Sequence, residues 1–151
     1  MLIHAREPKI SLADEIHFLN QFLKQQCIEK GNKFKYDIIC DSKDLSLKIP
    51  SLILQPLIEN CIQHGLKNDH TDYIKIEFKI LTSQYVDVNI EENGHGFDLV
   101  QKMKINQNTA LNILYDRIKI FHENEKHKET NIESEKLDDS FIIKLKLPIL
   151  Q

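Results

Sequence analysis

The sequence predicts an α/β fold, a two-layer sandwich in which a mixed, mostly antiparallel sheet carries three helices on one face. Three segments repeat apolar residues at helical spacing, and each has only one apolar stripe to bury. The other patterned segments alternate apolar and polar residues, and most of them are joined in pairs by short turns. With 151 residues, no internal repeat and no linker, residues 1–151 are expected to form a single domain.

The first helix is predicted over residues 11–30, and a strand follows it. Ser11 is a suitable N-cap with Asp14 in the first turn, and Gly31 ends the pattern. The apolar positions of this helix are Leu12, Ile16, Leu19, Leu23 and Cys27. Residues 34–40 then alternate as a strand and run into the turn-rich segment 41–44.

The second helix is predicted to start near Leu54 and to end at Gly65. Pro56 is tolerated because it falls in the first turn. At 100° per residue the helix has an apolar arc and a polar arc. The apolar arc, expected in the core, holds Leu57, Ile58, Cys61 and Ile62, and the polar arc holds Glu59, Asn60, Gln63 and His64.

The remaining elements are two hairpins and a third helix. Residues 73–81 and 86–91 form the first hairpin, which runs into a loop at Glu92 that contains Gly94 and Gly96. Residues 102–109 are polar and patternless, and we expect them to form a mobile segment. The third helix spans 110–125, with Leu111, Leu114, Ile118 and Phe121 on one face. The last hairpin joins strands at 130–136 and 141–148.

Composition excludes several classes of protein. A net charge of -3 with no basic cluster argues against nucleic-acid binding. No apolar run approaches the ~18 residues of a membrane span, so no membrane contact is expected. Three cysteines without C-x-x-C spacing indicate a reducing, cytoplasmic compartment. The four glycines do not have the spacing of a Walker, Rossmann or kinase glycine loop.

Two segments contain residues suited to binding chemistry. Glu59, Asn60 and His64 project from one patch, and carboxylate and amide oxygens suit magnesium. The alternative is a solvated helix face. Gly94 and Gly96 allow a ligand to approach the backbone closely, and the alternative there is a tight turn after a strand.

Taken together, these segments resemble a known family. The sequence LILQPLIENCIQHG is similar to the asparagine box of the GHKL superfamily, and its variant form resembles LytS-type sensor histidine kinases. The resemblance extends over almost the whole chain and includes residues 11–30, which look like the linker-derived helix of that family. It implies the Bergerat ATP-binding fold.

The resemblance also implies roles for individual residues. Asn60 would coordinate a magnesium ion bridging the ATP phosphates, and Glu59 would act as general base or orient the acceptor. His64 and Gly65 would close the box beside the phosphates. Glu92, Gly94 and Gly96 match the family's D-x-G-x-G box, in which the Asp bonds the adenine amino group. Here the carboxylate belongs to Glu, which places it about 1.3 Å further out.

The other glycine boxes depart from the family pattern. The expected G-x-G-L falls on residues 108–111, where Asn108 and Ala110 replace both glycines. The final Gly-Thr pair falls on Ser140 and Phe141 or on Asp139 and Ser140. Losing two or three backbone hydrogen bonds to phosphate would weaken binding roughly 10- to 1000-fold.

The resemblance implies the ATP-binding catalytic domain of a two-component sensor histidine kinase. This domain would transfer the γ-phosphoryl group of ATP to a histidine outside the chain. Its partners would be a phosphoacceptor-histidine domain and a response regulator, within a homodimeric, membrane-anchored protein whose sensor lies elsewhere. The alternative is a degenerate, non-catalytic GHKL module, a pseudokinase that acts through protein contacts.

Overall fold

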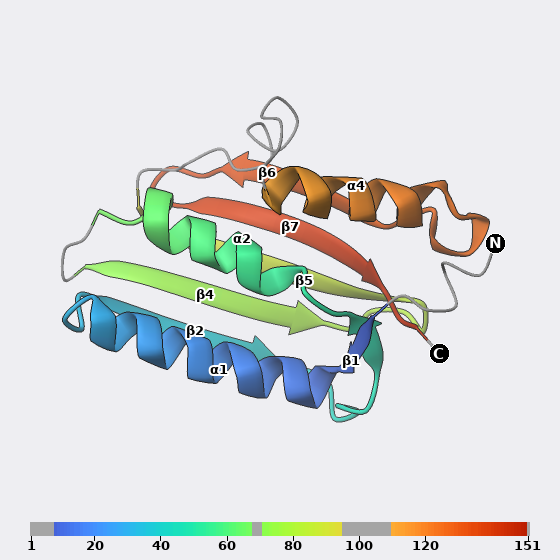
Figure 1. Ribbon diagram of the computed structural model, residues 1–151, viewed down its shortest axis with the longest axis horizontal. Helices are drawn as coiled ribbons and strands as arrows, with labels where there is room; N and C mark the ends of the chain where they lie inside the picture. The colour runs from blue at the N-terminus through green and yellow to red at the C-terminus, as the bar shows by residue number, and fades with distance from the viewer. Residues whose placement is uncertain (1–7, 68–70, 95–109, 151) are drawn as a thin grey trace.

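The computed structural model describes residues 8–67, 71–94 and 110–150. A five-stranded sheet in the order β2-β4-β5-β7-β6 carries the helices α1, α2 and α4 on one face, as Figure 1 shows. The predicted two-layer α/β sandwich is therefore confirmed. None of the helices in the described residues is both long enough and apolar enough to cross a membrane.

The elements follow one another in an order close to the predicted one. They are β1 (Lys9–Ser11), α1 (Leu12–Glu29), β2 (Phe34–Cys40), β3 (Lys48–Pro50), α2 (Leu54–Asn60), the π-helical η2 (Cys61–Gly65), β4 (Asp72–Lys79), β5 (Tyr85–Glu92), α4 (Ala110–Glu123), the 3-10 helix η3 (Glu125–His127), β6 (Asn131–Lys136) and β7 (Phe141–Pro148). Gly96 and the polar segment 102–109 lie outside the described residues.

Helix α1 has the predicted ends. The Ser11 side chain accepts a hydrogen bond from the Asp14 backbone N–H at 3.1 Å, which satisfies one of the free amides of the first turn. The chain leaves the helix through Gly31 at φ +68°, a left-handed conformation that costs glycine little. Leu12, Leu19 and Leu23 are buried against the sheet.

Helix α2 buries the predicted apolar arc and continues into a π-helical turn. Leu57, Ile58, Cys61 and Ile62 are each 5% exposed or less, so the predicted core face is confirmed. After Asn60 the chain continues as a π-helical turn, in which the Leu66 amide bonds to the Cys61 carbonyl five residues back at 3.2 Å. The sequence predicted one regular helix through Gly65. Single π turns of this kind are often found at functional sites.

The sheet is built mainly from antiparallel pairs. β4 pairs with β5, β5 with β7 and β7 with β6, all antiparallel, so both predicted hairpins are confirmed. β2 instead pairs with β4 in parallel, with Phe34 opposite Asp72, and the connection between them runs through β3 and α2. This crossover places α2 against the middle of the sheet (Figure 1).

A two-stranded sheet of β1 and β3, which the sequence did not predict, ties the segment before α1 to the middle of this crossover. Lys9 lies opposite Pro50, and the Ser51 amide donates to the Pro8 carbonyl at 3.0 Å. The start of α1 is thereby held beside the loop that enters α2. Strands of three residues are too short to show an alternating pattern.

Helix α4 holds the same loop through Arg117. Its Nη1 donates to the carbonyl oxygens of Ser51 and Leu52, at 2.9 and 3.3 Å. Leu52 has φ +62°, a left-handed conformation that is rare for a bulky side chain. Arg117 therefore stabilises a strained turn at the entrance to α2.

Replacing Arg117 with alanine is expected to lower the free energy of unfolding by about 1–3 kcal/mol, because the partly buried Ser51 carbonyl and the exposed Leu52 carbonyl lose a charged donor. Urea unfolding measures the change. The control is Lys119→Ala, which removes an exposed cation from the same helix. Equal stability of both variants would contradict a structural role for Arg117.

Candidate functional site

The polar arc of α2 places Glu59 and Asn60 at the end of the helix, both half-buried. The Asn60 amide nitrogen donates to the Pro56 carbonyl at 3.0 Å. This bond uses the NH2 end of the side chain and leaves the amide oxygen as the atom suited to a cation. The Glu59 carboxylate accepts a long hydrogen bond, 3.4 Å, from Gln63. His64 and Gly65 end the π turn η2, where the description covers their backbone only.

Glu92 is the last residue of β5 and is 3% exposed. It lies opposite Ile74 on β4 and Phe141 on β7, in the interior of the sheet. Its Oε2 accepts a hydrogen bond from the Gly94 backbone N–H at 3.0 Å. The carboxylate is thus held by the turn that follows it.

Cys61 shows that the helix and the Glu92 turn are neighbours. Burial raises the pKa of the Cys61 thiol to about 12, and the charge of Glu92 contributes to the increase. A charge acts on a thiol in this way only when the two groups are close. The thiol stays protonated near neutral pH, and Cys61 packs in the core.

Asn93 fixes the turn after Glu92. Its side-chain oxygen accepts from the Tyr73 amide at 2.8 Å, and its side-chain nitrogen donates to the Thr71 carbonyl at 2.7 Å. No motif in the sequence identified this residue as part of the site. The signal was its position before Gly94, since Asn-Gly pairs favour tight turns.

A cavity of about 310 Å³ lies beside this turn and joins three segments far apart in the sequence. Lys67 follows the π turn, Gly94 follows Glu92, and Ser140 lies in the turn between β6 and β7. Ser140 also donates from its hydroxyl to Glu91 at 2.8 Å. The fold therefore brings the asparagine-box segment, the first glycine turn and the replaced final Gly-Thr position to one end of the sheet.

This end of the sheet is acidic. The pKa of Tyr73 is raised, first by burial and then by the charges of Glu91, Asp139 and Glu92. Lys67 and Lys136 line the cavity and supply positive charge. A polyphosphate that approaches the carboxylates needs a cation to offset the repulsion.

The chain is related to LytS-type sensor histidine kinases. It is 29% identical over 93 residues to the sensor protein LytS of Bacillus subtilis and 31% identical over 94 residues to LytS of Oceanobacillus iheyensis. These matches include 61% and 62% of this chain but 16% of each relative, so the chain spans about a sixth of those proteins. No protein-family model matches the chain.

Solved structures give the same answer for the fold. The nucleotide-free catalytic domain of histidine kinase ThkA superposes with a TM-score of 0.64 at 17% identity, over 94% of this chain and 95% of that one. Histidine kinase AdeS of Acinetobacter baumannii gives 0.68 at 15% identity, over 95% and 68%. The chain has the fold of a histidine kinase catalytic domain.

The polar residues of this domain fit a magnesium ion that takes most of its ligands from water and from the substrate phosphates. The described ranges contain no group of three or more His, Cys, Asp or Glu residues that would hold a metal unaided. Magnesium usually keeps several waters and takes other ligands from substrate phosphates. A single amide oxygen such as that of Asn60 matches this chemistry.

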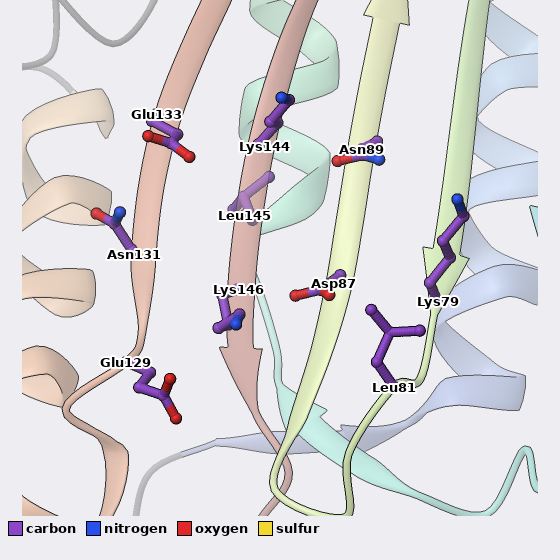
Figure 2. A pocket seen from close by; sticks show the side chains of 10 residues that line it. All are labelled: Lys79, Leu81, Asp87, Asn89, Glu129, Asn131, Glu133, Lys144, Leu145 and Lys146. Carbon is purple, nitrogen blue, oxygen red and sulfur yellow. The ribbon is translucent and has the colours of Figure 1, made fainter.

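The open face of the sheet has a larger cavity, of about 480 Å³, with different properties. Figure 2 shows it on the face opposite the helices, with Lys79, Asp87, Asn89, Glu133, Lys144 and Lys146 projecting from the strands. Lys144 bonds to Glu135 at 2.7 Å, and this bond raises the pKa of Lys144. Across the strands acids face bases, because Asp87 lies opposite Lys79 on one side and Lys146 on the other. The acidic and basic side chains on this open face of the sheet therefore offset one another.

Proposed function

We propose that this domain binds ATP with magnesium and transfers the γ-phosphoryl group to a histidine outside the chain. The observation that carries the proposal is one cavity formed by Lys67, the turn after Glu92 and the β6–β7 turn, with Cys61 of the asparagine-box segment close to Glu92. The relationship to sensor histidine kinases supports it. The transfer is mainly a matter of positioning and charge neutralisation, so a few polar groups suffice.

Asn60 and Glu59 are proposed to serve the phosphate end of the site. The Asn60 amide oxygen would bind magnesium, and the Glu59 carboxylate, one residue earlier, would accept a proton from the acceptor or orient it. Magnesium ATP supplies the phosphoryl group and the positive charge that offsets the phosphates. Within the resemblance, His64, Gly65, Gly94 and Gly96 would border the phosphates and the base.

Glu92 is proposed to face the adenine amino group. The longer side chain is turned toward its own loop, since Oε2 is used by the Gly94 amide. Base recognition then depends on a carboxylate that already accepts a hydrogen bond from its own turn. We therefore expect weaker discrimination between adenine and other bases than an Asp would provide.

The partners are also part of the proposal. The kinase ThkA has been solved in complex with the response regulator TrrA. By analogy, a response regulator and a phosphoacceptor-histidine domain would be the partners here. The parent protein would be a homodimer anchored in the membrane, with this domain in the cytoplasm.

A second candidate function is a non-catalytic GHKL scaffold. It is favoured by the replacement of glycines at Asn108 and Ala110, because a Cβ at a helix N-terminus hinders close approach of phosphate to the backbone amides. The hydrogen bond between the Gly94 amide and the Glu92 carboxylate also favours the scaffold. Such a module would act through protein contacts.

Titration separates the two functions. We expect the wild type to bind ATP weakly, and the double variant Asn108→Gly/Ala110→Gly to gain about tenfold or more in affinity for ATP and ADP. Glu92→Asp should gain less and should chiefly sharpen the preference for adenosine. Calorimetry with ATP, ADP and adenosine in magnesium measures these differences, and Ala13→Gly on the exposed face of α1 controls for adding a glycine to a helix.

Each outcome decides a specific point. Tight ATP binding by the wild type, with transfer to a separately supplied acceptor-histidine domain, would establish a kinase and contradict the weakened site. The scaffold would be favoured if none of the folded variants bound nucleotide.

A further inference from the structure

A second surface lies at the other end of α2, away from the candidate nucleotide site. An apolar groove of about 320 Å³ runs between the first turns of α1 and the loop that enters α2. We call it the α1–α2 groove, and it is lined by Ile10, Glu15, Phe18, Leu19, Ser51, Leu52 and Gln55. Phe18 and Leu52 leave 54% and 69% of their surfaces exposed. Large apolar side chains gathered around a groove are typical of a binding surface.

Glu15 is the unusual residue of this groove. It is 7% exposed, and within the described part of the chain its carboxylate has no hydrogen-bond or ion-pair partner. It is the only ionisable group among the lining residues, which come from β1, α1, the loop before α2 and α2 itself. A buried carboxylate without a partner is unfavourable unless a donor or a cation reaches it.

The exposure of Leu52 is maintained by the fold. Its left-handed backbone, φ +62°, is held by the Arg117 bonds to the Ser51 and Leu52 carbonyls. Strain of this kind persists only where surrounding contacts hold it, and it gathers at functional sites. The turn fixes an apolar side chain at the rim of a groove that also contains the largely desolvated Glu15 carboxylate.

We propose that the α1–α2 groove binds an amphipathic helix of a partner, which inserts aliphatic side chains between Phe18 and Leu52 and directs a Lys or Arg to Glu15. Apolar contact and charge complementarity both point to this occupant. A second copy of the chain fits poorly. A symmetric contact would bring two Glu15 carboxylates together with no cation in either groove lining.

The test uses the whole chain and a defined probe. The probe is an alanine-rich helical peptide that presents two leucines one turn apart and a lysine between them, and the control peptide has glutamine in place of the lysine. Chemical-shift titration should place the lysine peptide in the groove. Glu15→Gln should weaken it about tenfold or more and leave the glutamine peptide unaffected or improved.

Matched variants distinguish specific binding in the groove from nonspecific hydrophobic association. Leu52→Ala should weaken both peptides, whereas Leu81→Ala, which removes an equally exposed leucine from the β4–β5 turn, should change neither. Asp14→Asn, next to Glu15 but exposed, should leave the lysine peptide bound within about twofold. Binding of the lysine peptide should strengthen from pH 6 to pH 8, because Glu15 has a raised pKa of about 7 and must ionise to attract the cation.

Four results would overturn the proposal. The first is equal binding of the lysine peptide by wild type and Glu15→Gln, and the second is loss of binding in Leu81→Ala. If removing residues 1–7 strengthened peptide binding, the chain's own N-terminal segment would be the occupant. If sedimentation showed a dimer that Leu52→Ala dissociates, a second copy would be the occupant.

Discussion

Replacing Asn60 with alanine or aspartate is expected to abolish magnesium-dependent nucleotide binding, a weakening of about 100-fold or more, while the fold stays intact. Alanine removes the proposed amide ligand. Aspartate adds a carboxylate beside phosphates at an end of the sheet that is already acidic. Calorimetry with ATP, in magnesium and after chelation of magnesium, measures both effects.

The structure supplies a matched control for this substitution. On α1, the Asn20 side chain donates to the Ile16 carbonyl at 3.1 Å, the same contact that Asn60 makes with Pro56 at 3.0 Å. Asn20→Ala therefore removes an equivalent hydrogen bond from an exposed helix face remote from the proposed site. If Asn60→Ala and Asn60→Asp both bound nucleotide as the wild type does, the proposed role of the asparagine box would be wrong.

Replacing Glu15 with glutamine is expected to stabilise the protein at pH 8 by about 2–3 kcal/mol more than at pH 5. Burial raises the pKa of the Glu15 carboxyl from 4.5 to about 7, so the folded state binds a proton that the unfolded state has released. The wild type therefore loses stability as pH rises from about 4.5 to about 7 and then levels off. Glutamine carries no charge, and the variant escapes this loss.

Urea unfolding of wild type and Glu15→Gln at pH 5, 6, 7 and 8 measures the difference. The control is Asp116→Asn, which neutralises an exposed carboxylate on α4. An unfolding free energy that changes with pH identically in wild type and Glu15→Gln would show that the carboxylate is solvated. That result would also remove the acid on which the peptide-binding proposal depends.

The peptide-binding experiment can fail while the stability experiment succeeds. A pH-dependent stability without peptide binding would leave Glu15 as a buried acid and the groove without its proposed occupant. Neither result bears on nucleotide binding, because the groove and the Glu92 turn lie at opposite ends of α2.

Much of the site could be predicted from local sequence. The arc of α2 follows from helical geometry, and Gly94 after β5 marks the turn that holds Glu92. Two features could not be predicted. The hydrogen bond from Gly94 to Glu92 and the anchoring of the turn by Asn93 depend on contacts with β4 and on the exact path of the loop.

The sequence by itself determined the helices, the long strands and which face of each is buried, because one stripe of apolar residues has one favourable orientation against a sheet. Only the tertiary structure decided how distant segments meet. β1 and β3 are three residues each and pair across about 40 positions, so no local period marks them. Glu15 lies at the edge of the apolar stripe of α1 and is buried beside the loop held by Arg117. Burial of a polar group is a property of the assembled chain, since the atoms that exclude water come from elsewhere in the sequence.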